Sequence, residues 1–180
     1  MENQYYKRLI EEVIKHSCSD IWDNAILEWE IVSSEEDEDT QSICVCGKEN
    51  LRYLYTIQNV KNGNVLFPIG STCIKKFGRS DLNQEIAAYE DMFRLLRAVE
   101  AGEYIELTSK FFTRRLLLYL LNNDAFEANE YNHFNPEFDY EFLIQMFNKR
   151  NKDDITYAQQ RKIRAIIVNS IIPFMKTKIK

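Results

Sequence analysis

The sequence predicts an α+β protein in which a small antiparallel β module is followed by a helical C-terminal module. Residues 51–59 and 65–69 are short segments rich in β-forming side chains, and the Asn62-Gly63 pair between them is a strong hairpin signal. After Arg79 the apolar residues recur at helical spacing. We therefore expect two domains, with residues 1–79 forming the first and residues 80–180 the second.

The first domain is predicted to begin with a helix, because apolar residues recur at helical spacing over residues 4–15. Residues 25–32 then alternate, with Leu27, Trp29 and Ile31 on one side. This alternation predicts a strand whose large apolar side chains face inward. A helix therefore precedes the first strand.

The second and third strands are the two halves of the hairpin. Pro68 has no N–H to donate to a β-ladder, so the strand at 65–69 is expected at the edge of the sheet. Gly70 to Cys73 then open a short helix. The cysteines of this domain therefore fall at the corners of a small sheet.

The second domain is predicted to be helical throughout. A central helix is expected over the apolar run 111–121, and the last helix is expected to turn its isoleucines inward. Capping residues mark the boundaries of the other helices. Asp81 and Gln84 begin the first helix of this domain, and Gly102 ends it. Asn135 and Pro136 begin the third helix, and Thr156 and Gln159 begin the last one.

Charge is distributed unevenly along the chain, although the net charge is only −5. Residues 1–40 hold twelve acidic and three basic residues, whereas residues 149–180 hold nine basic and two acidic residues. Basic side chains on one helix face can follow the phosphates of a nucleic acid, although a solvated basic face is the simpler interpretation. The candidate nucleic-acid-binding residues are Lys75, Lys76, Arg79, Lys149, Arg150, Lys152, Arg161, Lys162 and Arg164.

The acidic run from Glu35 to Asp39 is most simply a solvated loop. A phosphate-mimicking patch presented to a nucleic-acid-binding protein is the alternative. A metal site is disfavoured, because consecutive carboxylates do not converge on one ion.

Three of the four cysteines occupy positions typical of a zinc site. Cys44 and Cys46 lie in a Cys-x-Cys-Gly turn, and Cys73 begins the helix after the hairpin. Zn²⁺ takes four such ligands in a tetrahedron, so the first domain is predicted to be a zinc-knuckle module with one structural Zn²⁺. The fourth ligand is Cys18 on chemical grounds, with His16 as the alternative. Small buried thiols are the competing interpretation, and a cysteine nucleophile is disfavoured.

The stretch from Cys44 to Leu82 resembles a cysteine-bearing module of uncharacterised proteins from bacteriophages and Gram-positive mobile elements. The shared pattern is Cys-x-Cys-Gly, then Tyr-x-Tyr-x-Ile-x-Asn, then Asn-Gly-Asn, then Ile-Gly-Ser-x-Cys-Ile. The resemblance implies a zinc-type site at Cys44, Cys46 and Cys73. It brings no established reaction, and it implies a bacterial host.

The sequence offers no recognisable catalytic constellation. It contains no G-x-S-x-G, Walker A, G-x-G-x-x-G or H-E-x-x-H motif, and it has only two histidines. We therefore expect no catalytic residues. No apolar run is long enough to span a bilayer, and the first fifteen residues are polar, so we expect no membrane association and a cytoplasmic location.

Three functional classes remain open. The favoured one is a non-catalytic, zinc-stapled protein that binds nucleic acid or a nucleoprotein complex through its basic C-terminal region. The alternative is a phage-type, anti-CRISPR-like inhibitor that contacts a host defence nuclease with its acidic N-terminal region. An enzyme such as a nuclease is the third class. We favour the first because the basic cluster is present in the sequence itself.

Overall fold

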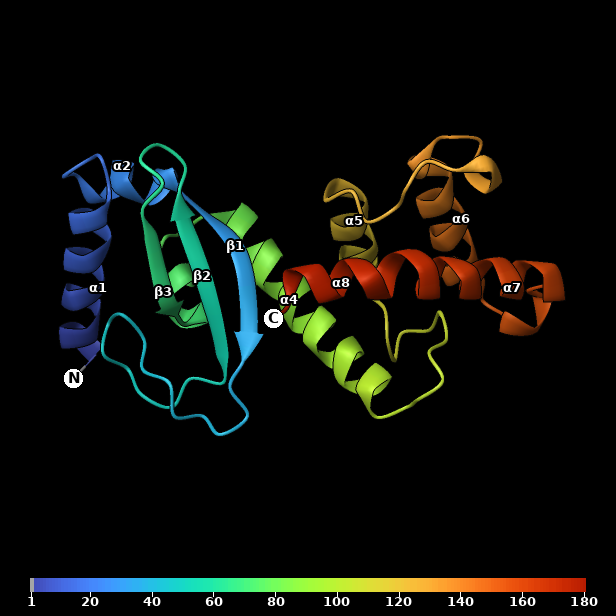
Figure 1. Cartoon of the computed structure of the whole chain (residues 1–180), viewed down its shortest axis with the longest axis horizontal. Coiled ribbons are helices and arrows are strands. Elements are labelled where there is room, and N and C mark those ends of the chain that lie inside the picture. The colour runs from blue at the N-terminus through green and yellow to red at the C-terminus, as the bar shows by residue number, and fades with distance from the viewer. Residues whose placement is uncertain (1) are drawn as a thin grey trace. The chain divides into compact units, whose positions relative to one another are not determined.

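A computed structural model describes the backbone of residues 2–180 and the side chains from residue 4 onward. The fold is α+β, with a three-stranded antiparallel sheet near the N-terminus and helices elsewhere (Figure 1). The chain divides into two compact units. The first unit runs up to Ile86 and also contains Lys178–Lys180, and the second is Ala87–Thr177.

The sheet of the first unit has the strand order β1-β2-β3. Ile57 of β2 is paired with Ile31 of β1 on one side and with Leu66 of β3 on the other, and all three are buried. β3 is an edge strand and contains Pro68, as the sequence predicts. The strands are β1 (Trp29–Glu36), β2 (Tyr53–Asn59) and β3 (Val65–Ile69).

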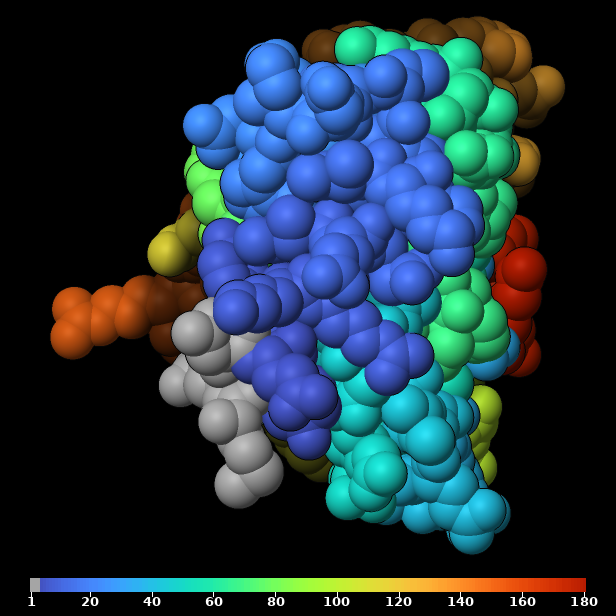
Figure 2. Space-filling model, turned by 90° about the vertical axis from the view of Figure 1, so that its left-hand side faces the viewer, coloured from blue at the N-terminus to red at the C-terminus, as the bar shows by residue number. Residues whose placement is uncertain are grey.

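Helix α1 (Glu2–His16) buries Leu9 and Val13 and contacts β3. Figure 2 shows α1 in dark blue across this face, with the cyan loop before β2 beside one end and the green β2–β3 turn beside the other. At the C-terminal end of α1, beside the β2–β3 turn, the His16 carbonyl accepts hydrogen bonds from the side-chain amides of Asn62 (3.1 Å) and Asn64 (3.0 Å). The hairpin turn is therefore fixed to the C-terminal end of α1.

The strand predicted over residues 25–32 is wrong at its beginning. Residues before Trp29 form a helical turn, α2 (Trp22–Ala25), and a 3₁₀ turn, Ile26–Glu28. Leu27 is consequently 63% exposed rather than inward-facing. The turn replaces the strand because it directs the Glu28 carboxylate inward, where that group accepts backbone N–H bonds from Cys18 and Ser19.

The acidic run is only partly a loop. Glu35 and Glu36 belong to β1, and Glu36 accepts a 2.7 Å hydrogen bond from Arg52. Asp37 then closes the turn, because its carboxylate accepts hydrogen bonds from the backbone N–H of Gln41 and from Ser42. The end of the run is therefore held by its own hydrogen bonds.

The second unit is helical. Thr113, Asn135 and Thr156 cap their helices with side-chain oxygens, and the last two caps are those that the sequence predicts. The buried core includes Tyr89, Phe93, Phe112, Leu143 and Ile167. The helices are α4 (Ser80–Glu100, which begins in the first unit), α5 (Arg114–Asn122), α6 (Pro136–Asn148), α7 (Tyr157–Ile166), a π-helical segment (Ile167–Ile171) and α8 (Ile172–Lys178), with 3₁₀ turns at Glu130–Asn132 and Lys152–Asp154.

The predicted central helix over residues 111–121 is shorter and more amphipathic than expected. Because Thr113 caps α5, Phe111 and Phe112 lie before the helix and fill the core from a loop. The outer face of α5 exposes Arg114, Arg115 and Leu118. In the described part of the chain, no helix is both long and apolar enough to cross a membrane.

Candidate metal centre and candidate nucleic-acid interface

Cys44, Cys46 and Cys73 form one cluster in the first unit. Their sulfur atoms all lie within 4.8 Å of one another. The Cys73 Sγ is 3.4 Å from the Cys46 Sγ and 3.7 Å from the Cys44 Sγ. All three side chains are buried. Three buried sulfur atoms at this spacing can ligate one metal ion.

The local backbone explains why the knuckle cysteines converge. The Cys44 N–H donates to the Lys48 carbonyl and the Gly47 N–H donates to the Cys44 carbonyl, which closes a tight turn. Gly47 has φ +92°, and a Cβ there would lie 2.9 Å from the Arg8 guanidinium. A residue with a side chain is therefore strained at this position.

Two contacts tie this turn to the segment that carries Cys73. The Val45 N–H donates a 2.9 Å hydrogen bond to the Pro68 carbonyl in β3. The Gly70 N–H, just before α3 (Ser71–Lys75), points at the Cys44 Sγ at 3.4 Å. Cys73 lies inside α3 and completes the cluster. The edge strand and the short helix thus position the third thiol.

The cluster favours one thiolate in the absence of a metal. The hydrogen bond between the Cys44 and Cys73 sulfur atoms, together with the Gly70 N–H, lowers the pKa of Cys44 to about 6. The same hydrogen bond and burial raise the pKa of Cys73. Burial raises the pKa of Cys46. Metal ligation deprotonates all such thiols, so binding here would displace protons.

Cys18 and His16 lie outside the cluster, so the structure does not assemble the predicted four-residue set. Arg8, in the first half of α1, is the residue beside Gly47. His16 is eight residues further along this helix, a rise of about 12 Å, and its carbonyl is held at the β2–β3 turn. Cys18 is exposed. Among the residues with described side chains, no other His, Cys, Asp or Glu joins the three cysteines.

A cavity of about 150 Å³ adjoins the cluster. Cys44 and Cys73 form part of its wall, together with Lys48, Asn50 and Ser71. One side of the cluster therefore faces a space that solvent-sized molecules can enter.

Comparison of the chain with protein-family models, curated proteins and solved structures gave no match. The fold and the site define an α+β protein with a buried three-cysteine cluster.

Four of the nine predicted phosphate-binding residues donate hydrogen bonds to backbone carbonyls. Lys162 reaches the Tyr131 carbonyl at 3.4 Å, and the other three form shorter bonds. Arg79 donates from Nη1 to the carbonyls of Ile26 (3.1 Å) and Trp29 (2.6 Å). Lys152 donates to the last carbonyls of α6, and burial lowers its pKa. Lys149 donates to the Asp154 carbonyl at 2.8 Å. These three side chains have structural roles that compete with phosphate binding.

Helix α7 carries two exposed arginines among the predicted residues. Arg161 and Arg164 are exposed and Ile163 and Ile166 are buried, as the helical spacing predicts. Lys162, on the same helix, is partly neutralised by Asp139, whose carboxylate lies 3.5 Å away. The other predicted residues with exposed side chains are Arg150 on the second unit and Lys75 and Lys76 on the first.

Exposed aromatic rings accompany the α7 arginines. The guanidinium carbon of Arg161 is 6.0 Å from the centre of the Tyr157 ring. That of Arg164 is 4.7 Å from the Tyr104 ring. Tyr104 is 67% exposed and Tyr157 75% exposed. Tyr104 is distant from Arg164 in the sequence. The only sequence signal for an exposed ring is its polar surroundings, between Glu103 and Glu106.

Two other aromatic residues, close in sequence to the predicted basic residues, do not lie on an open surface. Phe77 is 2% exposed and packs edge-on against Trp22. Phe147 is half-buried beneath the side chains of Arg114 and Lys152. Both rings therefore contribute to packing.

Proposed function

We propose that this chain is a metal-stapled nucleic-acid-binding protein. The first unit is held by one structural Zn²⁺ on Cys44, Cys46 and Cys73, and helix α7 of the second unit contacts nucleic acid. The observation that carries the nucleic-acid proposal is the pairing of exposed arginines with exposed tyrosines, Arg161 with Tyr157 and Arg164 with Tyr104.

Zinc is the metal that we propose for this donor set. Thiolates are soft ligands, and sites built from cysteines select Zn²⁺ or Fe–S clusters and Cu(I) over the hard ions Mg²⁺ and Ca²⁺. A staple at this place would join the knuckle turn to α3 across β3. We propose a structural role for the ion, with a group from solvent completing the tetrahedron beside the three cysteines, and no catalytic step is assigned to it.

The surface of α7 carries groups for both kinds of contact with a nucleic acid, attraction to phosphates and stacking on bases. Lysine and arginine side chains attract phosphates, and their contacts release counterions. Tyrosine rings and guanidinium planes stack on bases, which is the usual device of proteins that bind single strands. A merely solvated basic face has no need of exposed tyrosines beside its arginines.

Fluorescence anisotropy with labelled single-stranded and double-stranded oligonucleotides, measured over a range of salt concentrations, tests the proposal. We expect binding at low salt that weakens steeply as salt is added. Replacing Arg161, Lys162 and Arg164 together by Ala should weaken binding to all sequences alike and reduce the salt slope by about 2 to 3, roughly one for each phosphate contact removed.

A matched control removes three positive charges elsewhere. Lys7, Lys15 and Lys176 are exposed, and their replacement by Ala makes the same change in net charge. This control should retain the parent's binding. Absence of binding by the parent at low salt would refute the proposal and would favour the protein-contact alternative, in which the partner is a host defence enzyme. A pull-down from bacterial lysate, with and without nuclease treatment, tests that alternative.

A further inference from the structure

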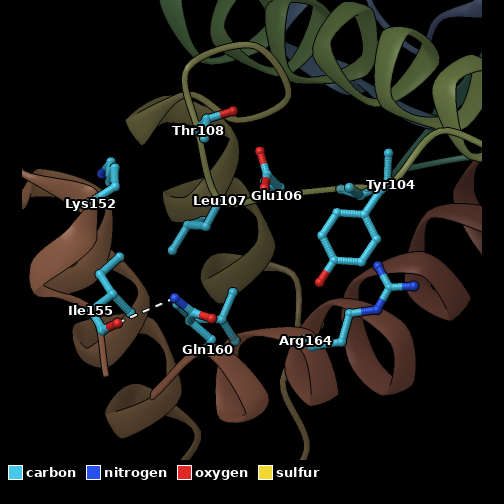
Figure 3. A pocket seen from close by; sticks show the side chains of 10 residues that line it. Tyr104, Glu106, Leu107, Thr108, Lys152, Ile155, Gln160 and Arg164 are labelled. Atoms are coloured by element: carbon cyan, nitrogen blue, oxygen red, sulfur yellow. Dashed lines mark hydrogen bonds between the residues drawn. The ribbon is translucent and has the colours of Figure 1, made fainter. Parts of the chain in front are cut away.

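A pocket of about 180 Å³ lies in the second unit between the loop at residues 104–108 and helix α7. Its floor is apolar, because Ile105, Leu107, Ile155 and Ile163 line it and each is at least nine-tenths buried. Figure 3 shows the Tyr104 ring beside the Arg164 side chain on one side, Leu107 and Ile155 on the other, and Gln160 between them.

The rim of this pocket is polar and aromatic. Tyr104 and Arg164 form the close cation–π pair, and Glu106 and Gln160 are also exposed. The Gln160 amide nitrogen donates a 3.3 Å hydrogen bond to the Ile155 carbonyl, which leaves its side-chain oxygen available as an acceptor. The exposed Glu106 is also among the residues that line the pocket.

The size and the lining restrict what can bind. Pockets for drug-sized ligands or cofactors measure about 300 to 1,000 Å³, so this pocket is too small for a whole nucleotide. An apolar floor with an aromatic ring and a guanidinium at one side suits a single planar ring. Acceptors at the rim suit a ring whose edge carries N–H groups, as nucleobases do.

We propose that this pocket receives one unstacked base of a single-stranded nucleic acid, with the base stacked against Tyr104 and Arg164. The inference rests on the proposed nucleic-acid-binding function and makes it more specific. Arg161, one turn before Arg164 on α7, contacts the phosphates, and the Gln160 side-chain oxygen accepts a hydrogen bond from an N–H group at the base edge. A duplex cannot present such a base without unpairing it, so single strands are the preferred ligand.

The test compares a labelled oligothymidylate with an abasic oligomer of the same backbone and length. The parent protein should bind the oligothymidylate more tightly than the abasic strand. Tyr104→Ala should weaken binding to the oligothymidylate by about 5-fold to 150-fold, the range for the loss of one stacked base. It should leave binding to the abasic strand and the salt slope unchanged. Tyr104→Phe keeps the ring and should retain the parent's affinity.

The outcomes separate this inference from the proposed function. If the parent binds both strands equally and Tyr104→Ala has no effect, the base pocket is refuted while nucleic-acid binding stands. If the parent binds neither strand, the proposed function itself fails. Because Tyr104 is 67% exposed, Tyr104→Ala should keep the melting temperature of the parent. An equal loss of affinity for both strands would also overturn the pocket, because it would show a general effect on the surface.

Discussion

Asn59 donates a 2.7 Å hydrogen bond from Nδ2 to the Oε2 atom of Glu28, and both side chains are fully buried. The same carboxylate accepts the backbone N–H groups of Cys18 at 2.7 Å and Ser19 at 3.1 Å, and Lys61 Nζ lies 3.3 Å from its other oxygen. Glu28 therefore joins the segment after α1, the start of β1 and the β2–β3 turn. A buried carboxylate is tolerated here because four donors surround it.

The first prediction concerns acid stability. The Asn59 hydrogen bond, with the Cys18 N–H and Lys61, lowers the pKa of Glu28 from 4.5 to about 2. A lowered pKa means that the stability contributed by this group is complete above pH 4.5 and is lost as the pH falls towards 2. Glu28→Gln should lower the free energy of unfolding at neutral pH and should make its decrease in acid shallower.

Tryptophan fluorescence is the measurement for this prediction, because both tryptophans, Trp22 and Trp29, lie in the first unit. Denaturant titrations at several pH values would report on that unit alone. Glu38→Gln, which removes the same charge from an exposed side chain, should behave as the parent. Identical acid profiles for Glu28→Gln and the parent would show that Glu28 does not contribute as described.

Glu28 also shows where reasoning from sequence fails. Alternation places this residue on the side of the predicted strand opposite Trp29, and glutamate is almost never fully buried unless it is paired. Its partners are ten residues away at Cys18 and thirty-one away at Asn59, and no local pattern links them. The hairpin turn and the capping residues at Asn135 and Thr156 were predictable because their signals are local.

The four cysteines also differ in how far local patterns predict their positions. Cys44, Cys46 and Cys73 could be predicted to converge because a turn, a hairpin and a short helix follow one another directly in the chain. Cys18 was placed with them on chemical grounds alone. Its distance from the cluster depends on how α1 lies against β3, which is a matter of tertiary packing.

The second prediction concerns the metal. Protein purified without added metal should contain about one zinc per chain, and Cys73→Ser should lose it. Because a bound ion stabilises the folded state with the logarithm of its concentration relative to Kd, a free-ion concentration a thousandfold above Kd corresponds to about 4 kcal/mol. Chelation should therefore lower the melting temperature of the first unit markedly. Elemental analysis and tryptophan-monitored melting measure the two effects.

Cys18→Ser is the matched control for the metal prediction. It changes the same side chain at an exposed position outside the cluster and should retain both the metal and the melting temperature. Loss of zinc from Cys18→Ser would restore it as the fourth ligand. An unchanged melting temperature after chelation would eliminate the staple role even if zinc were present.

The third prediction concerns Arg79, which the sequence places among the phosphate contacts. Its guanidinium bridges the carbonyls of Ile26 and Trp29 and pairs with Asp81. Arg79→Ala should cost the first unit about 1.5 to 3 kcal/mol, as expected for hydrogen bonds from a charged donor. Arg79→Lys should recover little, because an ammonium lacks the planar fork of the guanidinium. Neither variant should change the nucleic-acid affinity measured by anisotropy. If a folded Arg79→Ala protein showed a reduced salt slope, Arg79 would be a phosphate contact after all.

The fourth prediction concerns Glu85. Burial of its carboxyl group raises its pKa from 4.5 to about 7. The charges of Glu30 and Asp81 add to this rise, and the charge of Lys178 opposes it. A carboxyl with a raised pKa holds its proton in the folded protein over this interval, so stability falls as the pH rises from 4.5 through 7 and levels off above. Glu85→Gln removes the cost of burying the charge. It should stabilise the first unit at pH 8 by up to about 3 kcal/mol and have little effect at pH 5.

Tryptophan-monitored denaturation at the two pH values measures the difference, with Glu49→Gln, at an exposed position, as the control. An equal gain at both pH values would mean that the substitution acts through packing and that the carboxyl does not titrate in this interval.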